Sequence, residues 1–225
     1  MRLDHALLKL EFDRKIFHVA WALLPLLYYF GYPRDGMLLL LFIELLIWIG
    51  VEAVRKTGYP IVSAELMREH EKQGAPMGTL YQITSLFLAV LFFDREIAIL
   101  AMLFCCIGDS VTAFAGAILL PYLGRGKTAI RTLTARESGT FSSAGNLLQA
   151  LVHRKSAILM LVMFGTCLAL GYLFFPRQPL AVIVAGCLGA VIADAFAWRV
   201  AGITMNDDLT IPLVSGALMS LLVIL

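Results

Sequence analysis

Long apolar runs alternate with short polar links along the whole chain. Seven of the runs approach or exceed the length of about 17–25 residues that a helix needs to cross a bilayer. They are residues 16–32, 37–54, 78–93, 97–120, 156–175, 180–200 and 209–225. The pattern predicts an all-α fold, a polytopic transmembrane bundle of about seven helices. Because no internal repeat or low-complexity tract divides the chain, we expect a single domain, residues 1–225.

Residues 139–152 are harder to place than the seven long runs. These 14 residues are few for a span, and many of them are small and polar. We expect a re-entrant or interfacial helix here, and an eighth span is the alternative.

The composition agrees with a membrane protein. Hydrophobic residues make up 60% of the chain and charged residues 15%, and the mean hydropathy is +0.85. A soluble domain has about 45–50% apolar and about 25% charged residues. These values exclude a water-soluble fold, a disordered chain, a nucleic-acid-binding arm and a disulfide scaffold. The four cysteines lie inside apolar runs without ligand spacing, so we expect buried thiols that pack as small hydrophobic side chains.

The net charge of +2 conceals a one-sided distribution of the positive residues. With seven spans and a cytoplasmic N-terminus, 15 of the 18 lysines and arginines fall on the inner side, where such residues concentrate. The outer links keep only Arg34, Arg95 and Arg177. An eighth span would move Arg154 and Lys155 outside, so we expect seven. The resulting polar inner face is typical of a reaction between a soluble reagent and a lipid.

The first candidate site lies where the chain enters the first span. Four polar residues there fall within an arc of about 100° on a helix: Glu11, Arg14, Lys15 and His18. Two fixed cations, an imidazole and a carboxylate at this position suit the binding of a polyphosphate. The alternative is that the cations anchor the helix at lipid phosphates and that His18 is a core residue.

The second candidate site is Asp109, in the middle of an apolar run. An ionised aspartate at the centre of a span costs about 2.5–3.5 kcal/mol, so such a residue usually has a function. Gly108 keeps the neighbouring helix surface small, which allows close helix packing or the close approach of a ligand. Asp109 is a candidate to hold Mg²⁺ or to accept a proton from an alcohol. The alternative is a hydrogen bond to another helix.

Two further segments carry candidate chemistry. Asp207 and Asp208 open the last span, followed by Thr210; these residues suit helix capping, and the carboxylates equally suit Mg²⁺. Arg125 and Lys127 lie in a basic link with two glycines that has the character of a phosphate-binding loop without Walker A spacing. Juxtamembrane charge is the alternative for this link.

Charged residues elsewhere near the spans have simpler explanations. Glu52 and Arg55 are three residues apart and can pair on one helix face. Glu71 follows His70 in a polar link, where a solvated loop is expected. Asp194 lies inside the sixth run.

Together these motifs resemble the polytopic family of dolichol kinase, phytol kinase and CTP-dependent diacylglycerol kinase. The resemblance covers most of the chain through ordered motifs: Glu11-x-x-Arg14-Lys15-x-x-His18, Glu52-x-x-Arg55, Arg68-x-x-Glu71 with Gly78, Gly108-Asp109 with Ala113 and Gly116, the basic link 124–127, and Asp207-Asp208-Leu209-Thr210-Ile211-Pro212-Leu213. The last motif is the most specific. The chain departs from the family around Glu137, where a lysine is replaced, and at Asp194, where the family tends to have glutamate.

The resemblance implies phosphoryl transfer from CTP, with Mg²⁺, to the hydroxyl of a long-chain lipid alcohol of the polyprenol or dolichol, phytol or geranylgeraniol, or diacylglycerol type. It implies that Arg14, Lys15 and Lys127 bind the triphosphate. Asp109 and Asp208 would hold Mg²⁺ or, for one of them, act as general base. Further nucleotide contacts are implied for Glu11, His18, Gly108, Arg125, Asp207 and Thr210, and lipid-facing or supporting roles for Glu71, Glu137 and Asp194.

Two other functions stay open on the residues alone. A CTP-dependent cytidylyltransferase would use the same donor and metal, but would make a CDP-lipid and release pyrophosphate. A non-catalytic transporter or scaffold would use Asp109 and Asp194 as a proton or ion path. Transporters more often carry polar features at both faces of the membrane, which the charge distribution here does not show.

Overall fold

The computed structural model describes residues 15–59, 61, 67, 69–72, 74–122, 156–195, 199–200, 203–204 and 206–224. The chain begins there with an apolar helix, Lys15–Tyr29, whose second part is α2. The elements then follow in this order: α2 (Leu23–Tyr29), α3 (Arg34–Lys56), α4 (Glu69–Lys72), α5 (Gly78–Phe92), α6 (Arg95–Leu103), the π-helix η1 (Phe104–Asp109), α7 (Ser110–Tyr122), α10 (Ala157–Phe174), α11 (Leu180–Ala195), β1 (Arg199–Val200), β2 (Ile203–Thr204) and α12 (Asp207–Ile224).

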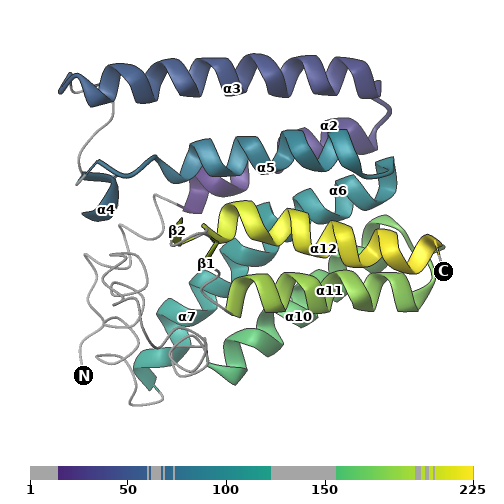
Figure 1. Cartoon of the computed structure of the whole chain (residues 1–225). Helices are drawn as coiled ribbons and strands as arrows, with labels where there is room; N and C mark the ends of the chain where they lie inside the picture. Colours follow the sequence, from purple (N-terminus) through teal and green to yellow (C-terminus); the bar gives the residue numbers. More distant parts are fainter. Residues whose placement is uncertain are drawn as a thin grey trace.

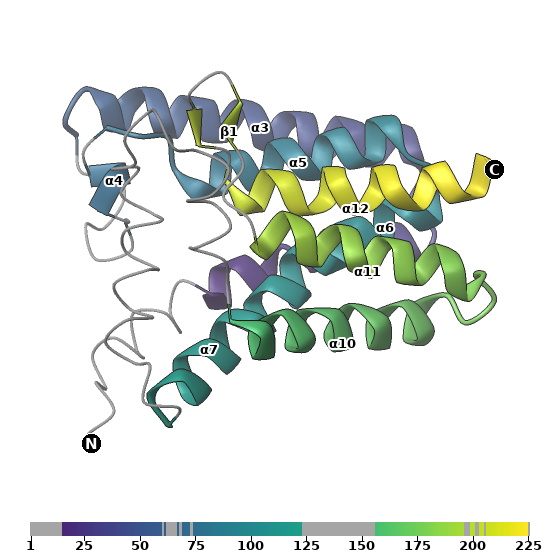
Figure 2. The same ribbon diagram turned by 60° about the horizontal axis from the view of Figure 1, so that its bottom comes forward.

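The helices form a bundle in which α12 is central. It packs against α11, α5 and α6, while α10 packs against α11 and α3 against α5. Figure 1 shows α3, α5, α12 and α11 running side by side, and Figure 2 shows α12, α11 and α10 in successive rows. One end of the bundle therefore collects the start of α5, the start of α12 and the end of α11. The opposite end holds the start of α6 and the link from α10 to α11.

Four helices in the described part of the chain are long and apolar enough to cross a membrane: Arg34–Lys56, Arg95–Leu119, Ala157–Phe174 and Asp207–Ile224. Three apolar helices are shorter: Lys15–Tyr29, Gly78–Phe92 and Leu180–Ala195. Large apolar side chains also cover the outside of the bundle. On α3, for example, Leu39 is 61% and Leu46 53% exposed. This helical fold is that of an integral membrane protein, whereas a full set of seven spans stays a prediction.

The first helix differs from the prediction of an unbroken span over 16–32. A turn at Trp21 and Ala22 interrupts it, and the helix ends at Tyr29. Pro25 explains the interruption, because proline has no N–H to donate to the carbonyl four residues earlier, which here belongs to Trp21.

The sixth predicted span, 180–200, extends beyond the end of the observed helix. Helix α11 stops at Ala195, and residues 199–200 instead form β1, which pairs antiparallel with β2. Arg199, expected at the end of the span, stands opposite Thr204 in this hairpin. An arginine is costly inside an apolar span, which favours ending the helix before it. The hairpin, with two residues in each strand, is a local exception in a fold that is all-helical as predicted.

The packing of α11 against α12 depends on a glycine. A Cβ added at Gly189 would lie 2.8 Å from the Cα of Ser215, a distance that real contacts do not reach. The two backbones therefore approach as closely as small residues allow in membrane helix pairs. This close packing brings the last turn of α11 next to the first turn of α12.

The predicted re-entrant segment 139–152 lies outside the described residues.

Candidate functional site

Charged side chains gather at the end of the bundle where α12 begins. Six of them within the described chain are almost fully buried, and they come from six elements: Lys15, Glu52, Glu71, Asp109, Asp194 and Asp208. Charged residues are rarely buried in this way unless they are paired, because the loss of hydration costs free energy. The contacts among them therefore define the candidate site.

Asp109 lies at the end of the π-helix η1 and is 2% exposed. Lys15 donates from Nζ to Oδ2 of Asp109 in a buried salt bridge. His18, one turn after Lys15 on the same helix, places Nε2 3.6 Å from the same oxygen. The prediction that Lys15 and His18 share one helix face is confirmed. π-Helical turns are frequent at functional sites, and this one sets the position of Asp109 in a long apolar stretch.

Asp208 lies on the other side of His18. Nε2 of His18 is 3.6 Å from Oδ1 of Asp208 and 3.3 Å from the carbonyl oxygen of Cys105. The backbone of Asp208 is also held in place. Its carbonyl accepts a hydrogen bond from Oγ of Ser85 at 2.7 Å, and its N–H donates to Oδ1 of Asn206 at 2.9 Å. His18 is therefore the common neighbour of Asp109 and Asp208, the two aspartates predicted to hold Mg²⁺.

Three carboxylates form a second part of the site. One oxygen each of Asp109, Asp194 and Asp207 lies within 4.8 Å of the others. They come from η1, the last turn of α11 and the first turn of α12. Oxygen donors of this kind suit a hard divalent cation such as Mg²⁺, and the partial exposure of Asp207 leaves the group accessible. We call Asp109, Asp194 and Asp207 the carboxylate triad.

The carboxylate triad differs from the pair of ligands predicted from sequence. The prediction assigned Mg²⁺ to Asp109 and Asp208, and it gave Asp194 a supporting role. The structure groups Asp109 with Asp194 and Asp207 and places Asp208 beside His18. The difference arises because neighbouring residues at the start of a helix point in directions about 100° apart.

Glu71 connects the site to the start of α5. Its Oε1 accepts a hydrogen bond from the N–H of Gly78 at 2.7 Å. Gly78 borders Asp208, since a Cβ added there would lie 3.2 Å from Oδ2 of Asp208. The predicted supporting role of Glu71 thus has a geometric basis, and the expectation of a solvated position is wrong for Glu71 itself, which is buried.

Arg55 fixes the link that carries Glu71. Its Nη1 donates to the carbonyl of Glu71 at 2.6 Å and its Nη2 to that of Ala75 at 2.7 Å. The same guanidinium makes two hydrogen bonds to Glu52, at 3.0 and 2.7 Å. The predicted pairing of Glu52 with Arg55 is confirmed, and the pair also ties α3 to the link before α5.

Gly108 and Thr210 make local contacts in the structure. A Cβ at Gly108 would lie 3.1 Å from Sγ of Cys167 and 3.2 Å from Sδ of Met163, so this glycine allows close packing against α10. The hydroxyl of Thr210 donates to the carbonyl of Asn206 at 3.3 Å. Their implied contacts with a nucleotide stay predictions.

Five residues implied in the site lie outside the described part of the chain: Glu11, Arg14, Arg125, Lys127 and Glu137. Their implied roles in binding the triphosphate, the nucleotide or the lipid therefore stay predictions. Lys15 and His18 are the described members of the first motif.

Sequence reasoning missed several residues that line the site. Gln82 donates to the carbonyl of His18 at 3.4 Å, and Ser85 holds the backbone of Asp208. A signal for them existed, because two polar residues one turn apart stand out in the apolar run 78–93. Cys105 was expected to act only as a small hydrophobic residue, and nothing in its spacing indicated that it lies beside His18.

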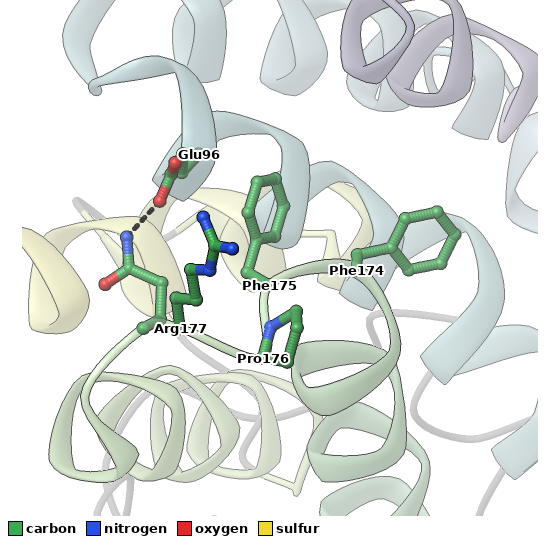
Figure 3. A pocket seen from close by; sticks show the side chains of 6 residues that line it. Glu96, Phe174, Phe175, Pro176 and Arg177 are labelled. Carbon is green, nitrogen blue, oxygen red and sulfur yellow. Dashed lines mark hydrogen bonds between the residues drawn. The ribbon is translucent and has the colours of Figure 1, made fainter.

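A cavity of about 320 Å³ lies at the opposite end of the bundle. Figure 3 shows it between the start of α6 and the link from α10 to α11, where Gln178 donates a hydrogen bond to Glu96. Its lining is formed by Glu96, Phe174, Phe175, Pro176, Arg177 and Gln178. The helices separate this cavity from Asp109 and Asp208, so it is not part of the candidate site.

The fold and the site define an all-helical membrane protein with a buried cluster of carboxylates, a lysine and a histidine at one end. No known protein family matches the chain, and no solved structure matches it. The chain is 26% identical over 211 residues to the uncharacterized protein RP860 of Rickettsia prowazekii (strain Madrid E), a similarity that covers 90% of each protein. Because this relative is itself uncharacterized, the similarity indicates no activity for the chain.

Proposed function

We propose that the protein transfers the terminal phosphate of CTP to the hydroxyl of a membrane lipid alcohol, with Mg²⁺. The observation that supports this proposal is the meeting of three distant motifs at one buried end of the bundle. Lys15 and His18, Asp109, and Asp207 with Asp208 come from the start, middle and end of the chain. Phosphoryl transfer depends mainly on positioning and on neutralising charge, which such a cluster supplies.

The carboxylate triad has the donor chemistry for the metal. Asp109, Asp194 and Asp207 would hold Mg²⁺, which when bound neutralises negative charge on the phosphates. Lys15, which forms a salt bridge with Asp109, would supply a positive charge for a phosphate oxygen. The resemblance adds Arg14, Arg125 and Lys127 as further cations for the triphosphate.

Asp208 is our candidate for the general base. In the proposed step its carboxylate accepts the proton of the lipid hydroxyl, the alcohol oxygen bonds to the terminal phosphorus, and CDP leaves. His18, 3.6 Å away, orients the carboxylate. Gly78 has no side chain, so its backbone packs closely against this carboxylate: a Cβ there would lie 3.2 Å from Oδ2 of Asp208.

The orientation in the membrane is part of the proposal. We infer seven spans, a cytoplasmic N-terminus and a site at the cytoplasmic face, where CTP is found. Support comes from the positive residues, because Arg95 begins α6 and Arg177 lies in the link from α10 to α11, at the end of the bundle opposite the start of α12.

Cysteine labelling tests this orientation. The four native cysteines are buried, so an impermeant maleimide is expected to spare them in whole cells. Arg177→Cys should be labelled from outside and Arg154→Cys only after the membrane is opened. External labelling of Arg154→Cys, or protection of Arg177→Cys, would contradict the proposed topology.

A screen of nucleotides against lipid alcohols tests the reaction. Purified protein is incubated with each labelled nucleoside triphosphate and each alcohol, with and without Mg²⁺. We expect a phosphorylated lipid and CDP, formed only with CTP and Mg²⁺. A CDP-lipid with pyrophosphate would identify a cytidylyltransferase instead. Absence of any labelled lipid, together with substrate movement into vesicles, would identify a transporter.

A further inference from the structure

A group of three different donor types lies beside the carboxylate triad. Nε2 of His18, Sγ of Cys105 and a carboxylate oxygen of Asp208 are all within 4.8 Å of one another. They come from the first helix, from η1 and from α12. We call these three residues the mixed-donor group.

The spacing of the mixed-donor group is close to that of a tetrahedral metal site. Nε2 of His18 is 3.6 Å from Oδ1 of Asp208 and 4.0 Å from Sγ of Cys105. Bonds from Zn²⁺ to nitrogen, oxygen and sulfur are about 2.0–2.3 Å, which puts ligands of a tetrahedral site about 3.3–3.6 Å apart. Both distances from His18 are therefore within a few tenths of an ångström of the ligand spacing in such a site, and Sγ of Cys105 lies within 4.8 Å of the carboxylate oxygen of Asp208.

The two neighbouring groups prefer different cations. The carboxylate triad offers only oxygen, the donor that Mg²⁺ prefers. The mixed-donor group offers a thiol and an imidazole, which select Zn²⁺ and other transition metals. Its imidazole is the accessible member, because the side chain of His18 is 10% exposed whereas that of Asp208 is 3% exposed.

We propose that His18, Cys105 and Asp208 form a second cation site, which binds Zn²⁺ and thereby switches off the Mg²⁺-dependent reaction. Binding replaces the thiol proton of Cys105, which passes to water. The inhibition rests on the proposed function, because the bound ion would occupy the carboxylate of Asp208 and the imidazole of His18. Binding itself does not depend on that function.

Cobalt absorption tests the binding site without any turnover. Co²⁺ is added to purified full-length protein in excess Mg²⁺, and the near-ultraviolet band of a cobalt–thiolate bond is recorded. The band is expected in the native protein and in the control Cys106→Ala, whose thiol is buried one residue away. It is expected to vanish in Cys105→Ala and on addition of Zn²⁺. No band in the native protein, or a band retained in Cys105→Ala, overturns the proposal.

If Cys105→Ala misfolds, Cys105→Ser replaces it in this experiment, because the serine side chain is close in size to that of cysteine. Gel filtration in detergent shows which of Cys105→Ala and Cys105→Ser is folded. His18→Ala should also lose the band, which separates the mixed-donor group from a site made by Cys105 with other residues. A band unchanged in His18→Ala would contradict the ligand set.

Inhibition is measured separately, in the lipid-kinase assay. Zn²⁺ is expected to abolish turnover of the native protein and of Cys106→Ala, whereas the turnover that remains in Cys105→Ala or Cys105→Ser is expected to be insensitive to Zn²⁺. Equal inhibition of all variants would overturn the regulatory role. If no form of the protein turns over CTP, the proposed function fails, and the cobalt spectrum still decides whether the site exists.

Discussion

The charge of Asp109, which lies deep in an apolar helix, is compensated by Lys15. Its salt bridge with Lys15 offsets part of the hydration that both groups lose, and removing one partner of such a pair leaves a buried charge uncompensated. The effect on stability therefore belongs to the ion pair and not to either residue alone.

Replacement of Lys15 by methionine tests this pairing. We expect Lys15→Met to lower the free energy of unfolding by about 3–5 kcal/mol, and the double variant with Asp109→Asn to recover most of that loss. Lys56→Met is the matched control, because Lys56 is 56% exposed and its contact with Glu52 is 3.8 Å long. Its effect should stay below about 1 kcal/mol. Equal stability of Lys15→Met and the native protein in detergent unfolding would contradict the pairing.

Gly78 is a second test at the level of single residues. Its Cβ position lies 3.2 Å from Oδ2 of Asp208, so Gly78→Ala should displace that carboxylate by a few tenths of an ångström. We expect a loss of turnover of about tenfold or more, with the fold retained. Gly50→Ala is the control, since nothing lies within 4 Å of its Cβ position in α3. Equal turnover of the two variants would argue against Asp208 as the base.

Among the elements, the link before α5 depends on Arg55. One guanidinium binds Glu52 and the carbonyls of Glu71 and Ala75, so it joins α3 to the segment that positions Gly78. A lysine keeps the charge but has no planar fork to satisfy all of these acceptors.

Arg55→Lys should therefore loosen this link. We expect a destabilisation of about 1–3 kcal/mol and faster hydrogen exchange at the N–H of Gly78, which Glu71 protects. Lys56→Arg, one residue along the same helix, should change neither quantity. Unchanged exchange at Gly78 in Arg55→Lys would show that the link is held by other contacts.

The helices could largely be predicted from the sequence, because apolar runs must be covered by lipid or protein. The ends of α3, α5, α10 and α12 agree with the predicted runs to within three residues. Local exceptions could not be placed in the same way. Hydropathy does not distinguish the π-helix η1 from an α-helix. It also does not predict the interruption of the first helix, which follows from the missing N–H of Pro25, or the hairpin after α11.

For the whole molecule, the candidate site could be predicted only as separate motifs. Charged residues inside apolar runs indicated Asp109 and Asp194, and spacing indicated Lys15 and His18. Which carboxylates meet depends on how η1, α11 and α12 pack, and this packing joins Asp194 to Asp207. Cys105 could not be predicted as a neighbour of His18, because a buried thiol in an apolar run is compatible with simple packing.

The bundle as a whole separates its polar end from its apolar sides. The buried charges lie where α12 begins, and the exposed apolar surface of α3 lies along the side. In the proposed reaction the lipid acceptor approaches from the side and the nucleotide from the polar end. The proposed function requires that this end of the bundle transfers phosphate from the nucleotide to the lipid.

The most direct measurement is the transfer of labelled terminal phosphate from CTP to lipid alcohol by purified variants. The native protein and Glu96→Gln, a carboxylate change at the opposite end, should both form labelled lipid phosphate with Mg²⁺. Asp109→Asn and Asp208→Asn should each abolish the product while gel filtration in detergent shows a folded protein. Near-normal turnover in either aspartate variant would contradict the assignment of the site.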